Sequence, residues 1–415
     1  MKPLLVPAQD KHGRLTFRRP AVRICKRPTS VLSPQSSLGS RHGCGRQAGV
    51  ITRRQILGAG AFAALGIAGE ASHPASAAGK RTDVTFLVIN DVHACRIGDA
   101  LSPGCATEGK TDASLLKHVA ALNNVHTLRW PTEIDGRQTG LTGGGEPITS
   151  PRGVVACGDI TDDGGGQTAL LREGAQLRQF AQRYEEGPGP GRVRYPVYVG
   201  LGNHDLDQDG KPPEVNWYRD ELRDYVRMNH KPSVFFRPPY PADNYDEASD
   251  SYSWNWETLH LVQLQRFAGD TTKGAASGLP WLKHDLETYA ADGRPVVLFQ
   301  HYGWDAFSRE RWDPANRQFD DAGSGAPHWW SDAERQAFRD VIAGHNVVAL
   351  FHGHEHDTPM IYQADGLDIV KPTAAYKGGF GIVRITDRFM DVVLAEASDD
   401  KGGIRFLAAH AKPLG

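Results

Sequence analysis

The sequence lacks a long apolar run, an internal repeat and an excess of basic residues. Its apolar run at residues 58–69 is too short and too rich in Gly and Ala for a comfortable membrane span. No segment recurs at a fixed period, which argues against a repeat architecture. The 415 residues, 40% hydrophobic and 23% charged, are ordinary for a soluble globular protein with one large domain or two smaller ones.

Charge is unevenly distributed along the chain. Residues 1–78 hold 12 of the 47 Lys and Arg but only two of the 49 Asp and Glu, which leaves 35 basic and 47 acidic residues and a net charge of −12 for the remainder. So acidic a body would repel a phosphate backbone. We therefore expect no nucleic-acid binding through a basic face. An anionic substrate must be attracted locally, by metal or by a few arginines.

The first 78 residues have the pattern of an extension followed by an export signal. Residues 1–50 are rich in Arg, Ser, Pro and Gly, and we expect them to be disordered or an upstream extension. Residues 51–78 resemble a twin-arginine signal peptide, with Arg53-Arg54 before the apolar run and Ala75-Ser76-Ala77 as a cleavage site. An uncleaved anchor or a chance arginine pair is the alternative. The signal predicts transient contact with the twin-arginine export machinery and a periplasmic, secreted or cell-surface protein of residues 79–415.

Five cysteines are present, and two of them, Cys25 and Cys44, lie in the segment expected to be removed. Cys95 and Cys105 flank a loop rich in Gly, Ser and Pro, where an exported protein can keep a disulfide. Spacing alone leaves two free thiols equally open. Cys157 ends an apolar run and is most simply a small buried residue.

Short runs rich in Val, Ile, Leu and Phe recur from residue 83 onward. Apolar runs bounded by Gly and Pro predict strands buried on both faces, and hence helices packed outside a sheet. We expect strands over residues 84–90, 154–157, 196–201, 259–264, 295–300, 347–351, 381–385 and 390–395. We expect helices over 113–123, 169–184, 281–290 and 333–342, the last begun by a capping box of Ser331 and Glu334.

Residue types that bind metals follow five of these strands. The motifs are Asp91-Val92-His93, Gly158-Asp159-Ile160-Thr161-Asp162, Gly202-Asn203-His204-Asp205, His301 alone, and His352-Gly353-His354-Glu355-His356. In open α/β sheets, ligands bind outside the carboxyl ends of the strands. Chance is a poor account of five such motifs in order. The pattern therefore predicts a metal site at one rim of the sheet.

Together these motifs resemble those of the calcineurin-like metallophosphoesterase superfamily, over residues 83–396. Each motif alone is weak, but the series is highly specific. The resemblance implies a four-layer α/β sandwich, with two mixed β-sheets flanked by helices and two metals at their carboxyl edge. It also implies a hydrolase that cleaves phosphate esters by attack of a metal-bound hydroxide.

The resemblance assigns seven metal ligands. Asp91, His93 and His356 would bind one metal, Asn203, His301 and His354 would bind the other, and Asp159 would bridge both. Two cations about 3.5–4 Å apart need an anionic bridge to offset their repulsion, and a carboxylate provides one. The mixed nitrogen and oxygen set suits Mn, Fe, Zn or Co, among which the sequence does not distinguish.

His204 lies next to a ligand but is not assigned as one. The resemblance implies that it contacts the phosphate and protonates the leaving oxygen, oriented by a carboxylate. Asp162, three residues after Asp159, is the first candidate for that carboxylate, with Asp205 or Asp207 as substitutes.

Other residues have a plain structural interpretation beside a functional one. We expect His352 to be packed or to support a ligand rather than to be a third ligand of its motif. The segment 302–332 could line a substrate pocket or form a small core under a long loop, through Trp304, Arg309, Arg311, Trp312, His328, Trp329 and Trp330. The acidic run Asp205–Asp209 lacks the spacing of an EF-hand and is expected to be a solvated turn.

Two branches of the superfamily fit poorly. Purple acid phosphatases replace the histidine found here as His93 and carry tyrosine where this chain has Asp162. Secreted nucleotidases share the motifs around Asp91 and Asn203, but the 20 residues after Ala395 cannot form their second domain. Substrate recognition would then come from the insertions 94–110, 130–150, 207–255 and 302–332.

The substrate class stays open at this level. A small phosphomonoester or phosphodiester is the first hypothesis, and a phosphoprotein, phospholipid or phosphoinositide is the alternative. A non-catalytic scaffold with this fold is disfavoured, because no predicted ligand is missing. The oligomeric state is not readable from the sequence.

Overall fold

A computed structural model describes residues 8–9, 15–16, 81–97, 100–101, 105–162, 175–206, 217–271, 275–303, 312–313, 318–319, 331–364 and 366–414. The chain divides into two units, Met1–Ser72 and His73–Gly415. In the first unit, β1 (Ala8–Gln9) pairs antiparallel with β2 (Leu15–Thr16). The rest of the expected extension, and the expected signal segment 51–78, lie outside the described residues.

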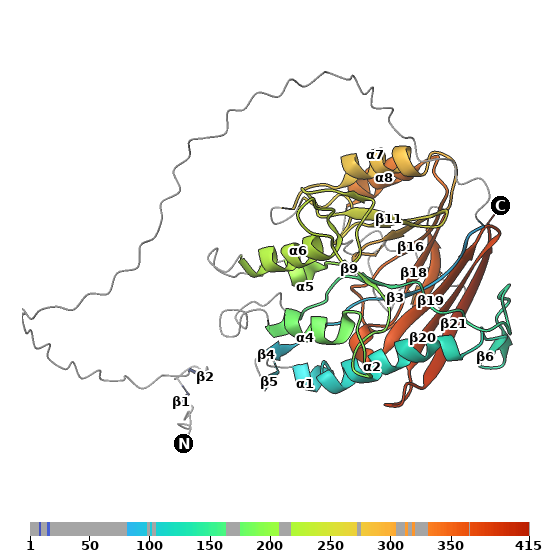
Figure 1. The fold of residues 1–415 in the computed structure, drawn as a ribbon. Helices are drawn as coiled ribbons and strands as arrows, with labels where there is room; N and C mark the ends of the chain where they lie inside the picture. Colours follow the sequence, from blue (N-terminus) through green and yellow to red (C-terminus); the bar gives the residue numbers. More distant parts are fainter. Residues whose placement is uncertain are drawn as a thin grey trace, which may run out of the picture. The chain divides into compact units, whose positions relative to one another are not determined.

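Two mixed sheets form the centre of the second unit (Figure 1). The first has the strand order β21-β20-β19-β3-β8-β9. Its parallel strands are β3 (Asp83–Ile89), β8 (Val154–Cys157) and β9 (Val197–Gly200). Its antiparallel strands are β19 (Gly379–Thr386), β20 (Phe389–Ala397) and β21 (Ile404–Pro413).

The second sheet has the strand order β10-β11-β12-β13-β16-β18-β17. Its parallel strands are β12 (Leu259–Gln263), β13 (Val296–Phe299), β16 (Val347–Phe351) and β18 (Leu367–Lys371). Its antiparallel edges are β10 (Asn244–Tyr245), β11 (Tyr252–Trp256) and β17 (Met360–Ala364).

The inner faces of the two sheets share one core. Phe86 of β3 packs against Phe299 of β13 and Phe351 of β16, with ring centroids 6.1 and 6.2 Å apart. All three side chains are fully buried. The apolar runs expected from the sequence are therefore the strands of this core, with bounds that differ by at most two residues from those expected.

Helices cover the outer faces and complete the four layers expected from the sequence. α2 (Asp112–Asn124) and α4 (Ala175–Tyr184) pack beside the first sheet. α7 (Leu279–Tyr289) and α8 (Asp332–Ile342) pack outside the second, with Leu282, Leu286 and Phe338 against Val296, Leu298 and Leu350. Ser331 and Glu334 form the predicted capping box of α8. The first residues of the helix expected over 169–184 lie outside the described residues.

Several further elements are present that the sequence did not predict. The largest is α6 (Trp217–His230), in a segment treated only as an insertion, and α1 (Cys105–Glu108) and α5 (Asn203–Leu206) are single turns. Short pairs are β4 (Arg96–Ile97) with β5 (Ala100–Leu101), β6 (Glu133–Ile134) with β7 (Arg137–Gln138), and β14 (Trp312–Asp313) with β15 (Gln318–Phe319). Two 3₁₀ turns span Val125–Thr127 and Ala375–Lys377. Within the described stretches, no helix combines the length and apolar character that crossing a bilayer requires.

Candidate metal centre

The five motifs meet where their strands end. They follow β3, β8, β9, β13 and β16, and their residues are Asp91 and His93, Asp159, Asn203 and His204, His301, and His354 and His356. Two of the strand ends belong to the second sheet and three to the first. The site is therefore assembled from loops of both sheets, as the strand-end pattern predicted.

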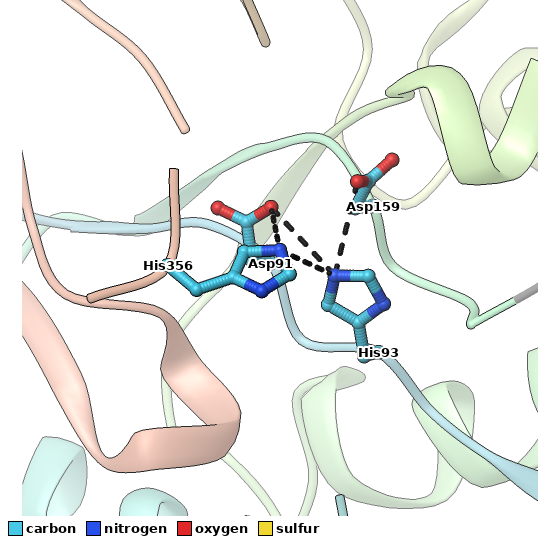
Figure 2. A group of neighbouring side chains, drawn as sticks. All are labelled: Asp91, His93, Asp159 and His356. Atoms are coloured by element: carbon cyan, nitrogen blue, oxygen red, sulfur yellow. Dashed lines mark hydrogen bonds and ion pairs between the residues drawn. The ribbon is translucent and has the colours of Figure 1, made fainter. Parts of the chain in front are cut away.

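One group of side chains contains Asp91, His93, Asp159 and His356, whose potential ligand atoms all lie within 4.8 Å of one another. Figure 2 shows both imidazole rings directed toward the carboxylates. His93 Nε2 lies 3.8 Å from Asp91 Oδ1 and 3.8 Å from Asp159 Oδ2. His356 Nε2 lies 3.4 Å from Asp91 Oδ1. Two ring nitrogens and two carboxylate oxygens thus converge on one point.

A second group contains Asp159, His301 and His354. His301 Nε2 lies 3.0 Å from Asp159 Oδ2 and 3.0 Å from Asn203 Oδ1. The other ring nitrogen, Nδ1, donates to the carbonyl oxygen of Cys157 over 2.8 Å. Because a carbonyl only accepts, neutral His301 carries its proton on Nδ1 and turns the lone pair of Nε2 toward Asp159. Asp159 belongs to both groups.

Each of the two buried carboxylates is anchored through one oxygen and unsatisfied at the other. Asp91 Oδ2 accepts from Asn90 Nδ2 and from the main-chain N–H of His354, over 2.6 and 2.9 Å. Asp159 Oδ1 accepts from the N–H of His204 over 2.8 Å. Asp91 Oδ1 and Asp159 Oδ2 receive no hydrogen bond, although both residues are fully buried. Buried charged oxygens are normally paired or bound to metal, so these donor atoms fit a metal pair.

The carboxylates create a strongly negative site. Burial alone would lower the pKa of His93, but its hydrogen bond with Asp162 and the nearby carboxylates of Asp91 and Asp159 raise it to about 9. Burial opposes the same change at His301, where the Asp159 charge raises the pKa to about 9. Burial lowers the pKa of His354 to about 3. The field that favours protons on His93 and His301 also favours cations, and a bound metal would replace those protons.

Four of the predicted ligands have left-handed backbone conformations. The φ angles are 50° at Asp91, 46° at His93, 50° at Asp159 and 76° at His354. Such conformations cost about 1–3 kcal/mol each in residues other than glycine, and they concentrate at functional sites. The fold therefore holds these loops in place at some expense of stability.

Two motif glycines are required by close approach. A Cβ atom on Gly202 would collide with the carboxylate of Asp159, and one on Gly353 would lie 2.7 Å from Asp91 Oδ2. Real Cβ atoms do not come so close to a buried oxygen. Glycine at each position lets one ligand loop pack directly against the carboxylate of another.

The structure differs from the expected link between Asp162 and His204. His204 Nδ1 contacts the main-chain carbonyl oxygen of Asp162, not its carboxylate. The carboxylate instead accepts from His93 Nδ1 over 3.2 Å and from Lys110 Nζ over 2.8 Å. Burial alone would raise the pKa of Asp162, but these two partners lower it to about 2. The Asp162 side chain therefore orients His93, and its backbone orients His204.

The first substitute is also excluded as the carboxylate that orients His204. Asp205 accepts from the main-chain N–H groups of Ile160, Thr161 and Gly202 and from the Thr161 hydroxyl. It thereby ties the loop after β8 to the loop after β9. It is buried, so the expectation of a solvated turn is wrong at this residue, and Asp207 lies outside the described residues.

Replacing Asp162 with asparagine tests this correction. We expect metal affinity to fall about 10–100-fold, as for other residues that orient a metal-binding histidine, while the rate with saturating metal changes little. Titration of metal against activity and against bound metal measures both quantities. Glu108→Gln is the matched control, because Glu108 pairs with Lys110 over 2.7 Å and makes no recorded contact with His93. Normal metal affinity with a large loss of rate would restore the original assignment.

Several supporting residues gave no sequence signal. Tyr376 places its hydroxyl 3.2 Å from His356 Nδ1, and its ring meets that of His93 edge to face. Gln265 accepts from the N–H of Leu201 through Oε1 and from the N–H of His301 through its carbonyl oxygen, each over 2.8 Å. Both residues lie outside the five motifs, and only the fold brings them near the site.

Three other expectations concern residues beside the site. His352 is fully buried, lies 2.9 Å through Nδ1 from the Gly353 carbonyl oxygen, and is in neither metal-binding group, which agrees with a packed residue. The structure pairs Cys95 with Cys105 as a disulfide, and Cys157 is a buried free cysteine. Of the expected aromatic and arginine wall, only the backbone of Trp312 is described, and the other six residues lie outside the described residues.

The profile of the calcineurin-like phosphoesterase family matches residues 84–358. No curated protein matches the chain in sequence. A dimetal phosphatase from Danio rerio is 14% identical, with 80% of this chain and 99% of that chain covered at a TM-score of 0.44. A purple acid phosphatase from yellow lupin (Lupinus luteus) is 12% identical, with 80% and 54% covered at a TM-score of 0.46. A calcineurin-like phosphoesterase from Bacillus subtilis is 12% identical, with 81% and 91% covered at a TM-score of 0.36.

Proposed function

Because the chain belongs to the calcineurin-like phosphoesterase family, we propose that it is a metal-dependent hydrolase of phosphate esters. The observation that carries the proposal is the pair of unsatisfied buried oxygens, Asp91 Oδ1 and Asp159 Oδ2, which face imidazole nitrogens at 3.4 and 3.0 Å. Without metal, only protonated imidazoles can satisfy these oxygens, and a pair of cations would take the place of those protons.

Seven side chains would hold the two metals. Asp91, His93 and His356 would bind one, Asn203, His301 and His354 would bind the other, and Asp159, which is common to both groups, would bridge them. The nitrogen and oxygen donors suit Mn, Fe, Zn or Co. When bound, such a pair supplies positive charge to the phosphate oxygens and lowers the pKa of water at the site.

His204 is the residue that would move a proton. It is half-buried beside Asn203, and its Nδ1 faces the Asp162 carbonyl oxygen. Since that oxygen can only accept, Nδ1 keeps its hydrogen in both protonation states and Nε2 is the atom that gains or loses a proton. His204 Nε2–H would therefore donate to the leaving oxygen of the ester as a general acid.

A small phosphomonoester or phosphodiester is the proposed substrate, with a phosphoprotein or a phospholipid as the alternative. The test compares p-nitrophenyl phosphate with bis-p-nitrophenyl phosphate in Mn²⁺. We expect turnover of at least one ester, its loss on chelation and its recovery when Mn²⁺ is restored, because the donor atoms converge on a metal pair. The ratio of the two rates assigns monoester or diester preference. No turnover of either ester with any of Mn, Fe, Zn and Co would contradict the proposal.

Export is a separate proposal that rests on the sequence alone. Arg53-Arg54, the apolar residues 58–69 and Ala75-Ser76-Ala77 support a twin-arginine signal. We expect Arg53→Lys/Arg54→Lys to retain the protein in the cytoplasm, since the export machinery reads the arginine pair. Cell fractionation with immunodetection measures this, and Arg18→Lys/Arg19→Lys, in the upstream extension, is the control. Equal export of both variants would contradict a twin-arginine route.

A further inference from the structure

Every exposed large apolar side chain among the described residues lies between positions 228 and 236. The exposed fractions are 63% for Met228, 93% for Val234, 95% for Phe235 and 49% for Phe236. The last three form a continuous apolar tip on the loop between α6 and β10. Soluble proteins rarely expose consecutive large apolar residues without an interaction to serve.

The loop that carries this apolar tip is held at its base. The N–H of Tyr240 donates to the Asn229 carbonyl over 3.1 Å, and the N–H of Ala242 donates to the His230 carbonyl over 2.8 Å. Within the loop, Phe235 N–H donates to Ser233 Oγ over 3.1 Å. Pro232, Pro238 and Pro239 also restrict the backbone. The tip is therefore presented by an anchored loop rather than by a frayed end.

The charged residues of the loop that carries the apolar tip are all basic. No acidic residue occurs between Asp224 and Asp243, whereas Lys231 and Arg237 flank the tip. Arg237 is exposed and has no ion pair recorded within the described stretches. Lys231 pairs with Glu247 over 2.7 Å, and the Glu247 side chain is 74% exposed. Surface pairs of this kind contribute little, so Lys231 can exchange its partner at modest cost.

We propose that the apolar tip inserts into the interface of a membrane that contains anionic lipid. Exposed fractions above nine-tenths at Val234 and Phe235 describe a protruding tip of three apolar residues, whereas a stable protein interface uses about 20–30 residues a side. A bilayer interface accepts a small apolar protrusion, and anionic headgroups attract basic residues beside it. The tip would hold the protein at the surface without crossing the bilayer, whatever ester the metal centre hydrolyses.

Flotation of the full chain with vesicles tests the proposal. We expect tighter binding to phosphatidylcholine mixed with phosphatidylglycerol than to phosphatidylcholine alone. Phe235→Ser/Phe236→Ser should weaken binding by about tenfold or more for each phenylalanine. Lys231→Gln/Arg237→Gln should weaken it about fivefold for each charge, on the anionic vesicles only. The basic N-terminal residues are common to all variants, so the differences report on the loop.

Lys401→Gln/Arg405→Gln is the charge-matched control, because both residues are exposed and lie near the turn before β21. It should bind like the wild type. All variants should keep their ester hydrolysis and metal content, which separates this test from that of the proposed function. Unchanged flotation of the Phe235→Ser/Phe236→Ser variant would overturn the proposal. So would sedimentation showing that the tip joins two copies of the chain and that vesicles bind neither form.

Discussion

Replacing Asp159 with asparagine is expected to remove the metal pair and to reduce kcat/KM by about 10³-fold or more, equivalent to about 4 kcal/mol of transition-state stabilisation. Asp159 is the residue that belongs to both metal-binding groups. Asparagine keeps an acceptor for the N–H of His204 but removes the charge that two adjacent cations require. Metal content after dialysis, together with kcat/KM for the preferred ester, measures both effects.

Asp285→Asn is the matched control for this prediction. Asp285 is as completely buried as Asp159 and accepts from Asn244 Nδ2 and Ser253 Oγ, over 2.8 and 2.6 Å. Loss of the Asp285 carboxylate should lower the free energy of unfolding while two metals remain bound per chain. If the Asp159 variant also kept two metals, the bridging assignment would be wrong.

Replacing His204 with alanine is expected to lower kcat about 10²–10⁴-fold while both metals stay bound. None of the seven proposed ligands is lost, and the anchoring hydrogen bond to Asp159 comes from the main chain of residue 204. The loss should depend on the leaving group. An alkyl phosphate, whose alkoxide needs a proton, should lose much more rate than p-nitrophenyl phosphate, whose phenolate leaves unaided.

This dependence distinguishes a proton donor from a residue that only packs beside the metals. His126→Ala is the control, because His126 is exposed and contacts only the Tyr195 hydroxyl among recorded side-chain partners. It should leave kcat unchanged for both esters. Equal loss for alkyl and aryl phosphates in the His204 variant would rule out general-acid catalysis. Loss of bound metal in this variant would instead indicate that His204 is a metal ligand.

The sequence was sufficient to predict the strands of the two sheets and the location of the site. Buried runs such as Val154–Cys157 leave little alternative to a central strand, and residues directly after parallel strands must meet at one edge. The direction of the Asp162 side chain could not be predicted from the sequence. That direction depends on Lys110, which lies 52 residues earlier and whose proximity follows from tertiary packing. Tyr376 was not predicted for the same reason, because His356, which it contacts, ends its motif 20 residues earlier in the chain.

Mostly polar segments were the second part of the fold that the sequence did not predict. α6 (Trp217–His230) carries Arg, Asp, Glu and Asn at many positions. Leu222 and Val226 recur at helical spacing and are buried, but the low apolar content of the segment led to its interpretation as an insertion. Its stability comes partly from contacts that no local pattern reveals, such as the pairing of Arg227 with buried Asp250 over 2.8 Å. A mostly polar helix is thus harder to predict than one rich in apolar residues, even where it buries an apolar stripe against the core.

The left-handed turns at Asp91, His93, Asp159 and His354 have a consequence for the thermal behaviour of the protein. In a chain without its ions the conformational stress remains, and only the surrounding imidazoles offset the mutual repulsion of Asp91 and Asp159. Ions that bind only the folded form would raise the melting temperature in proportion to the logarithm of their concentration. Metal supply would then govern the lifetime of the folded protein as well as its turnover, and ion-starved molecules would be the first to unfold on heating.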